Sequence, residues 1–224
     1  MITMGIYLAE RGLIPDVLLR FFIKRFSLSR LVEANNEERK MSVIDGLKTG
    51  PIAENTIDAN EQHYEIPADY FKAVLGPRLK YSCCWFDDES VSLGEAEIKM
   101  MESYLERAKI EDGQTILDLG CGWGSLSLFL AERFPNSAIY SVSNSNDQIE
   151  HIKNIAKEKN LENLHPEVQD VNSLTLNQQF DRVVSIEMFE HMRNYEALLQ
   201  KVKHLLKPDG LLFIHIFCHK ETAY

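Results

Sequence analysis

From Thr115 onward, short apolar runs alternate with longer segments in which apolar residues recur every three or four positions. A short run rich in Val, Ile and Leu is typical of a buried strand, and the longer period is typical of an amphipathic helix. Strands that alternate with helices indicate parallel βαβ units in a doubly wound sheet. We therefore predict an α/β fold with strands over 115–119, 138–143, 164–169, 181–186 and 211–217, helices over 124–133, 146–159 and 188–206, and a turn at "KPDG" (207–210) before the last strand.

The first part of the chain has a helical rhythm. In "IPDVLLRFFIKRF", Pro15 suits the first turn of a helix. The apolar positions that follow have helical spacing, namely Leu18, Leu19, Phe22 and Phe26, and basic residues border this stripe, namely Arg20, Lys24 and Arg25. Such a helix either docks on its own domain, which we favour, or makes peripheral contact with a membrane surface.

A change in composition near residues 46–60 predicts a domain boundary. "GLKTGPIAENTIDANEQHY" contains Gly, Pro, Asn and Thr without a period, which is typical of a loop. Beyond it, "PADYFKAVL" and "SLGEAEIKMMESYLERAKI" predict two helices. We expect an N-terminal helical region over 1–58 and a ligand-binding core over 59–224.

The loop after the first predicted strand has three glycines in five positions, Gly120, Gly122 and Gly124, in "ILDLGCGWGS". Glycines let the backbone approach a ligand that a Cβ atom would repel, and the next helix begins with a positive end. The spacing is G-x-G-x-G, whereas a dinucleotide fold uses G-x-G-x-x-G and a phosphate-binding Walker loop ends in Gly-Lys-Ser/Thr. S-adenosylmethionine remains as the expected ligand, with Asp118 contacting its cationic amino end. A glycine-rich turn that serves only tight packing is the alternative.

The overall composition and charge limit the classes of binding partner and the cellular compartment that we expect. The formal charge of −10 argues against a general nucleic-acid surface, which would need a basic footprint. Of the four cysteines, Cys83 and Cys84 are sequence neighbours and Cys121 lies inside the glycine loop, so a disulfide framework is not expected. No apolar run approaches the length of a membrane span. We therefore expect a cytoplasmic protein.

Several long motifs resemble one family. "NEQHYEIPADYFKAVLGPRLKYSCCWF", "ILDLGCGWGS", "SNSNDQ", "SIEMFEHMRNYEALL" and "HIFCHKETAY" are similar to the S-adenosylmethionine-dependent cyclopropane-fatty-acid synthases and coclaurine-type N-methyltransferases. The resemblance covers roughly residues 10–224, and "RGLIPDVLLRFFIKRF" resembles the N-terminal helices of the coclaurine-like branch. It implies a Rossmann-like class I methyltransferase sheet, here with its first five strands and an N-terminal helical extension.

The resemblance also implies cofactor contacts at matching positions. Tyr81 and Ser82 would cover the methionine end of S-adenosylmethionine, with Gly120, Gly122 and the rest of the glycine loop beneath it. The ends of the second and third predicted strands would face the ribose and the adenine. The residues implied there are Ser143, Asn144 and Gln148 for the ribose, and Asp170 and Val171 for the adenine.

"SIEMFEHM", directly after the fourth predicted strand, carries the candidate chemistry. Glu187, Glu190 and His191 are spaced i, i+3, i+4, so a helix beginning there would place them on one face. Two carboxylates beside an imidazole could bind a protonated amine and take up its proton. Acids at the positive end of a helix are the structural alternative.

The lipid-modifying branch of the family holds a bicarbonate ion as a base. Positions that match this site are Cys83, Ile186, Glu190 and His215. Glu187 favours the amine, because the lipid branch tends to have a small residue there. N-methylation of a small amine is therefore preferred over methylene transfer to an unsaturated phospholipid. The Cys and His residues of this region lack the paired spacing of structural metal sites, so no metal is expected.

A third possibility is a non-catalytic protein that binds the cofactor or a partner. Sheets of this fold usually finish with an antiparallel hairpin, and family members continue with segments that cover the substrate. The sequence stops at Tyr224, after the fifth predicted strand. We therefore expect a core truncated after that strand, with weak or no turnover by this piece alone.

Overall fold

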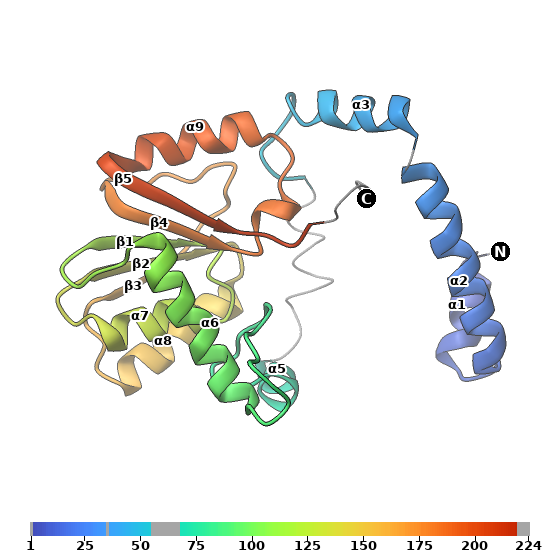
Figure 1. The fold of residues 1–224 in the computed structure, drawn as a ribbon, viewed down its shortest axis with the longest axis horizontal. Helices are drawn as coiled ribbons and strands as arrows, with labels where there is room; N and C mark the ends of the chain where they lie inside the picture. The colour runs from blue at the N-terminus through green and yellow to red at the C-terminus, as the bar shows by residue number, and fades with distance from the viewer. Residues whose placement is uncertain (1, 35, 55–67, 219–224) are drawn as a thin grey trace. The chain divides into compact units, whose positions relative to one another are not determined.

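The computed structural model describes residues 2–34, 36–54 and 68–218, and it divides them into two units (Figure 1). One unit holds the described residues up to Leu47 together with Cys218, and the other holds those of Lys48–Phe217. The boundary between the units therefore lies after Leu47, within the stretch 46–60 that the composition indicated, although the N-terminal region was expected to extend to residue 58. Residues 55–67, which include the whole of "NEQHYEIP", and residues 219–224, "HKETAY", lie outside the described residues.

The N-terminal unit consists of helices. They are α1 (Ile2–Glu10), α2 (Asp16–Ala34) and α3 (Glu37–Gly46). The prediction of a helix beginning at Pro15 is confirmed, because Pro15 directly precedes α2 and its carbonyl accepts the first hydrogen bond, from Leu18 N. Asn36 caps α3 by accepting a hydrogen bond from Arg39 N at 3.0 Å. Among the described residues, no helix combines the length and apolarity needed to cross a membrane.

The second unit is built on a five-stranded parallel sheet, which confirms the predicted fold class. The strands are β1 (Thr115–Leu119), β2 (Ala138–Ser143), β3 (Leu164–Val168), β4 (Phe180–Ile186) and β5 (Leu206–His215). Their order is β3-β2-β1-β4-β5, so the chain reverses direction across the sheet between β1 and β4. In an open α/β sheet, ligands bind at the carboxyl ends of the strands at this reversal.

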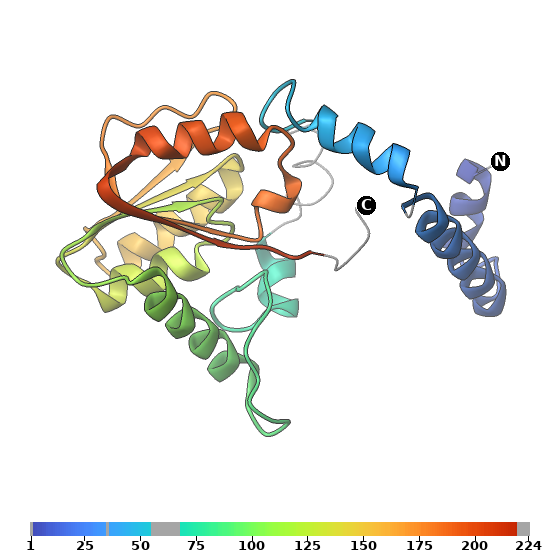
Figure 2. The same ribbon diagram turned by 45° about the horizontal axis from the view of Figure 1, so that its top comes forward.

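Helices cover both faces of the sheet, as Figures 1 and 2 show. They are α6 (Leu93–Ala108), α7 (Ser125–Arg133), α8 (Asn146–Glu158) and α9 (Tyr195–Leu205), while the short α5 (Ala68–Val74) lies beside α8. Apolar side chains of α6, α7 and α8 form one buried cluster with the sheet, and those of α9 form another on the opposite face. Burial of these two apolar layers on one sheet is what the alternating sequence pattern requires.

The predicted helix over 188–206 is wrong in its first turn. A short 3-10 turn, η1 (Phe189–His191), follows β4, and α9 begins only at Tyr195. Asn194 fixes that start, because its side-chain oxygen accepts a hydrogen bond from Ala197 N at 3.0 Å. The apolar period of the sequence runs through both pieces, so the cap rather than the period determines where the helix starts.

The predicted turn at "KPDG" is also wrong, because these residues lie inside β5. Leu206 pairs with Phe180, whereas Leu211 pairs with Arg182, so the extra residues form an irregularity in the strand. Gly210 permits it, because a Cβ atom there would lie 2.7 Å from the Phe180 carbonyl oxygen.

Candidate active site

The loop between β1 and α7 has a backbone that glycine makes possible. Gly120, Gly122 and Gly124 have φ angles of 84°, 53° and 81°, which side-chain-bearing residues rarely adopt. The N–H groups of Gly120 and Cys121 both donate to the Val142 carbonyl, and this holds the loop at the end of β2. The three glycines do not serve the same purpose, however.

Only Gly122 leaves open space beside the loop. A Cβ atom added there would meet nothing within 4 Å, whereas one added at Gly124 would lie 2.5 Å from Cγ1 of Ile152 in α8. Gly124 therefore permits close packing of two helices, and it does not line the pocket. At Gly120, which does line it, an added Cβ would meet the side chain of Met188 at 2.6 Å.

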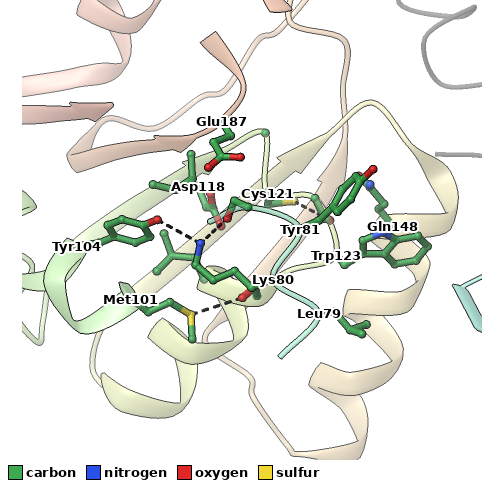
Figure 3. Close-up of a pocket in the computed structure, with 16 residues that line it drawn as sticks. Leu79, Lys80, Tyr81, Met101, Tyr104, Asp118, Cys121, Trp123, Gln148 and Glu187 are labelled. Carbon is green, nitrogen blue, oxygen red and sulfur yellow. Dashed lines mark hydrogen bonds between the residues drawn. The ribbon is translucent and has the colours of Figure 1, made fainter. Parts of the chain in front are cut away.

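A pocket opens at the carboxyl ends of β1 and β4, where the strand order reverses (Figure 3). Its lining comes from the segment before α6, from α6, from the glycine loop, from α8 and from the end of β4. Seven of the predicted cofactor-binding residues line it: Tyr81, Ser82, Asp118, Gly120, Gly122, Gln148 and Ile186. The segments that supply them are far apart in sequence, so only the fold brings them together.

Asp118 is the buried carboxylate of this pocket. It is 2% exposed, and Ser127 Oγ donates a hydrogen bond of 2.6 Å to its Oδ2. Burial raises the pKa of Asp118 to about 6, although the Ser127 hydrogen bond and the nearby Lys80 ammonium act against this rise. At neutral pH the group is therefore mainly ionised, and it provides a negative charge in a site of low dielectric.

The predicted ribose and adenine residues lie along the next two strand ends. Ser143 is buried and donates to Gln148 Oε1 at 2.7 Å, so it orients a pocket-lining side chain without lining the pocket itself. Asn144 follows it directly. At the end of β3, Asp170 Oδ1 accepts a hydrogen bond from Asn172 N at 2.7 Å. Asn144, Asp170 and Val171 lie outside the pocket lining.

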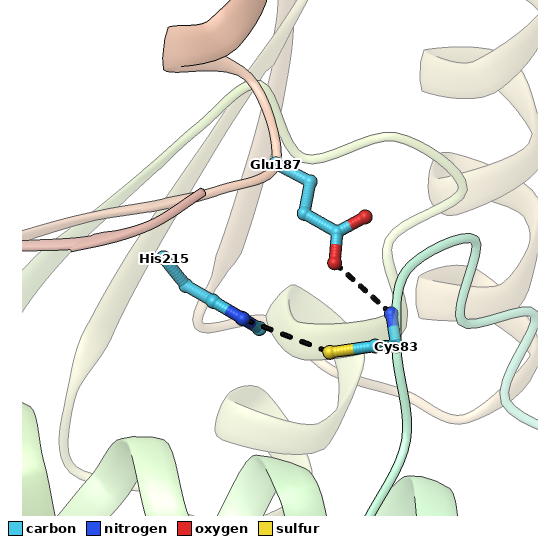
Figure 4. A group of neighbouring side chains, drawn as sticks. All are labelled: Cys83, Glu187 and His215. Atoms are coloured by element: carbon cyan, nitrogen blue, oxygen red, sulfur yellow. Dashed lines mark hydrogen bonds between the residues drawn. The ribbon is translucent and has the colours of Figure 1, made fainter. Parts of the chain in front are cut away.

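Three side chains meet beyond the end of β4, as Figure 4 shows. Glu187 has a left-handed backbone with φ of 51°, and its Oε1 accepts a hydrogen bond from Cys83 N at 3.0 Å. The Cys83 Sγ atom lies 3.6 Å from His215 Nε2. Burial raises the pKa of the Cys83 thiol, and the neighbouring Glu187 carboxylate raises it further.

This cluster is also the place where a metal ion could be held. One potential ligand atom from each of Cys83, Glu187 and His215 lies within 4.8 Å of the others, and no second group of this kind is found in the part of the chain that the structure describes. Cys83 Sγ contacts His215 Nε2, and the Glu187 carboxylate accepts a hydrogen bond from the Cys83 backbone. These contacts link the three residues into one polar cluster.

Glu190 and His191 do not share a helical face with Glu187, because no α-helix begins there. Glu190 Oε1 accepts a hydrogen bond from Phe217 N at 3.1 Å, while its Oε2 is buried without a partner among the described residues. His191 is exposed, and within the described ranges its side chain forms no hydrogen bond or ion pair with either glutamate. The predicted i, i+3, i+4 arrangement is therefore wrong in its geometry.

Burial lowers the pKa of His215, and the carboxylates of Glu187 and Glu190 act against this effect. Both carboxylates are thus close enough to influence the same imidazole. Glu187 has a left-handed backbone and Glu190 lies in the 3-10 turn, so the two act on this imidazole without sharing a helical face.

Lys80 and Tyr104 are buried polar residues of the pocket that were not predicted from the sequence. Lys80 is 6% exposed and donates hydrogen bonds to Ser82 Oγ and, over 3.2 Å, to the Tyr104 hydroxyl. The hydroxyl oxygen of Tyr104 lies 2.8 Å from His215 Nδ1. Lys80 adjoins the "YSCC" motif, and its charge within an apolar segment is a signal from which it could have been predicted. Tyr104 fits the apolar face of its helix and gives no such signal.

Comparisons with known proteins agree with this geometry. A model of the mycolic acid cyclopropane synthetase family matches residues 53–224. The (S)-coclaurine N-methyltransferase of Thalictrum flavum subsp. glaucum is 40% identical, over 96% of this chain and 61% of its own length. The cyclopropane-fatty-acyl-phospholipid synthase of Escherichia coli (strain K12) is 32% identical, over 72% of this chain and 41% of its own length.

Solved structures show the same relationship. A crystal structure of coclaurine N-methyltransferase bound to N-methylheliamine and SAH matches with a TM-score of 0.89 and 38% identity, over 100% of this chain and 66% of that one. The chain spans 61% and 63% of the length of two curated coclaurine N-methyltransferases. The resemblance that the motifs predicted is confirmed, and the chain belongs to the mycolic acid cyclopropane synthetase family.

Proposed function

We propose that the protein transfers a methyl group from S-adenosylmethionine to the nitrogen of a small amine. Two curated relatives at 40% and 38% identity are named coclaurine N-methyltransferases, and the similar solved structure holds SAH and N-methylheliamine. The observation that carries the proposal in this chain is a pair of carboxylates beside the pocket, one of which has a buried oxygen without a partner among the described residues.

The pocket fits the proposed cofactor. Asp118 places a buried negative charge beside the glycine loop, which suits a cationic amino group. Gly122 leaves open space where a side chain would project into the pocket. When bound, S-adenosylmethionine supplies an electrophilic methyl group on a positively charged sulfur. Tyr81, Ser82 and Gln148 would complete the binding surface as pocket-lining side chains.

Glu187 and Glu190 would handle the amine and its proton. A protonated amine is attracted by both carboxylates, but its nitrogen must lose a proton before it can attack a methyl group. Glu190 Oε2 is buried and lacks a donor within the described ranges. An ammonium N–H at that place would remove the cost of the unsatisfied oxygen. A carboxylate placed beside the amine nitrogen can accept its proton as a general base.

Methylene transfer to a phospholipid is the second candidate function, because Cys83 and His215 meet as the lipid-modifying branch requires. The Glu187 carboxylate argues against methylene transfer. The ligand atoms of Cys83, His215 and Glu187 lie within 4.8 Å of one another, so a bicarbonate ion that Cys83 and His215 would hold would meet the negative charge of Glu187. Two like charges at that separation repel by roughly 3 kcal/mol at an effective dielectric constant of about 20. A cation would gain from the same carboxylate.

A transfer assay tests the proposal. The chain is given S-adenosylmethionine with a labelled methyl group, together with a panel of secondary and tertiary amines in one arm and phospholipid vesicles with unsaturated acyl chains in the other. Label in the amine supports the proposal. Label only in lipid overturns the choice of acceptor, and calorimetry that detects no binding of S-adenosylmethionine overturns the proposal as a whole.

Glu187→Gly is the informative variant. Glu187 has a φ of 51°, so glycine relieves backbone strain there and the fold should be retained. We expect amine methylation to fall at least about tenfold, as the loss of a general acid–base group typically costs about a hundredfold or more, with cofactor affinity almost unchanged. Glu196→Gln, an exposed glutamate in the first turn of α9, is the matched control. Equal turnover in Glu187→Gly and the control would contradict the role of Glu187.

We also propose that the protein works in a reducing compartment, the cytoplasm. All four cysteines are free, including the sequence neighbours Cys83 and Cys84. Cys83 contacts the candidate active site, so oxidation would disturb it. Inactivation by a mild oxidant and recovery with a thiol reductant would support this; full resistance of the chain to oxidant would contradict it.

A further inference from the structure

A series of hydrogen bonds connects two pocket-lining residues, Lys80 and Tyr104, to His215, and the proposed function gives this series no role. The Lys80 ammonium donates to the Tyr104 hydroxyl at 3.2 Å, and that hydroxyl lies 2.8 Å from His215 Nδ1. The opposite ring nitrogen of His215, Nε2, lies 3.6 Å from Cys83 Sγ. These contacts thus connect the buried Lys80 side chain with the edge of the pocket.

The chemistry of the groups fixes the direction of each bond. Burial lowers the pKa of Lys80, and the nearby Glu187 and Glu97 carboxylates act against this effect. In its ammonium form Lys80 has three donors and no lone pair, so the Tyr104 oxygen then accepts from Lys80. Tyr104 has one hydroxyl hydrogen, and the lone pair of His215 Nδ1 is its remaining acceptor among these groups. A hydrogen on Nδ1 would point at the same oxygen as the Lys80 hydrogen, and the Tyr104 hydrogen would then have no acceptor.

We propose that Lys80 and Tyr104 hold His215 in the tautomer with its hydrogen on Nε2, so that the ring presents an N–H donor to Cys83 and the pocket. Lys80 and Tyr104 are thereby positioning residues. In the reaction, a consequence that rests on the proposed function, His215 does not accept the proton of the amine, and Glu187 and Glu190 remain as the acceptors.

Burial prevents Lys80 and Tyr104 from finding other hydrogen-bond partners, so it keeps the imidazole in this tautomer. Tyr104 is 1% exposed and Lys80 is 6% exposed, so bulk water cannot supply the missing partner of either group. Burial also raises the pKa of Tyr104, so the phenol retains the hydrogen that it donates. The Lys80 ammonium is further engaged with Ser82 Oγ, which fixes its position.

Nuclear magnetic resonance measures the tautomer directly and requires no methyl transfer. The 224-residue chain is labelled with ¹⁵N-histidine, and long-range ¹H–¹⁵N correlations are recorded at pH 8, where the lowered pKa of His215 keeps the ring neutral. Loss of signals in His215→Gln assigns them to His215. We expect the Nε2–H form in at least about fivefold excess, because an unsatisfied buried hydrogen costs about 1 kcal/mol or more.

Lys80→Met combined with Tyr104→Phe tests the cause. Replacing both partners by apolar groups of similar shape preserves packing and removes the donor to Nδ1. We expect the ratio of Nε2–H to Nδ1–H to fall about fivefold or more in this double variant. Tyr140→Phe is the matched control, because Tyr140 packs beside another histidine, His165, with ring centroids 4.8 Å apart.

The outcomes separate cleanly. Predominant Nε2–H in the unaltered chain and a lower ratio in the double variant support the proposal. Predominant Nδ1–H would overturn it, because a neutral Lys80 amine that accepts from Tyr104 would produce that result. An unchanged ratio in the double variant would also overturn it. Failure of the amine assay leaves these signals unaffected, so the two proposals fail independently.

Discussion

The glycine loop offers a quantitative test, because two of its glycines have different neighbours. Replacement of Gly122 or Gly124 by alanine imposes similar backbone strain, since both have positive φ angles, 53° and 81°. Left-handed backbone costs a residue with a Cβ roughly 1 to 2 kcal/mol. Only at Gly124 does the added Cβ also meet a buried side chain, Ile152, at 2.5 Å from Cγ1 and 2.9 Å from Cδ1.

The contact with Ile152 determines the size of the difference. Ile152 is 0% exposed, and its Cγ1 cannot move aside without shifting the core between α7 and α8. Overpacking of this kind costs about 1 to 3 kcal/mol. We therefore expect Gly124→Ala to lower the free energy of unfolding by about 2 to 5 kcal/mol, and Gly122→Ala by about 1 to 2 kcal/mol.

Urea denaturation followed by tryptophan fluorescence measures both variants. The chain has two tryptophans, Trp85 and Trp123, and both lie in the unit that contains the sheet. In a background of Ile152→Ala, which removes both clashing atoms, Gly124→Ala should cost at least about 1 kcal/mol less than in the unaltered chain. Equal losses in the two glycine variants, or no coupling with Ile152, would refute the reasoning.

Three further outcomes are expected. Calorimetry should show S-adenosylmethionine binding weakened about tenfold between pH 7 and pH 5, since Asp118, with its pKa raised by burial to about 6, is ionised above that pH and protonated below it; Asp118→Asn should remove this dependence. Ser127→Ala removes a donor to the buried Asp118 carboxylate, so the same titration should shift its midpoint to higher pH. Asn172→Ala should lower the free energy of unfolding in urea by about 1 to 3 kcal/mol, because its side chain donates to and accepts from the Ala53 backbone, both at 3.0 Å.

The positions of the strands could be predicted from the sequence, because burial on both faces requires continuous apolar runs. All five predicted strands are present, and the strands 115–119 and 138–143 have the predicted bounds. The ends of elements were less predictable. The start of α9 depends on the Asn194 cap, and β5 extends through "KPDG" because the chain there pairs with β4. Such pairings are set by distant partners, which local pattern does not contain.

The sequence by itself determined the α/β order, the glycine loop and the family, because each is recognisable from continuous stretches of residues. The tertiary structure alone decided what the loop glycines contact and which polar groups meet. Gly124 packs on Ile152, and Cys83 meets Glu187 and His215 across more than a hundred residues. Glu187 and His215 are neighbours because parallel strands bring their carboxyl ends to one edge of the sheet, wherever their residues stand along the chain.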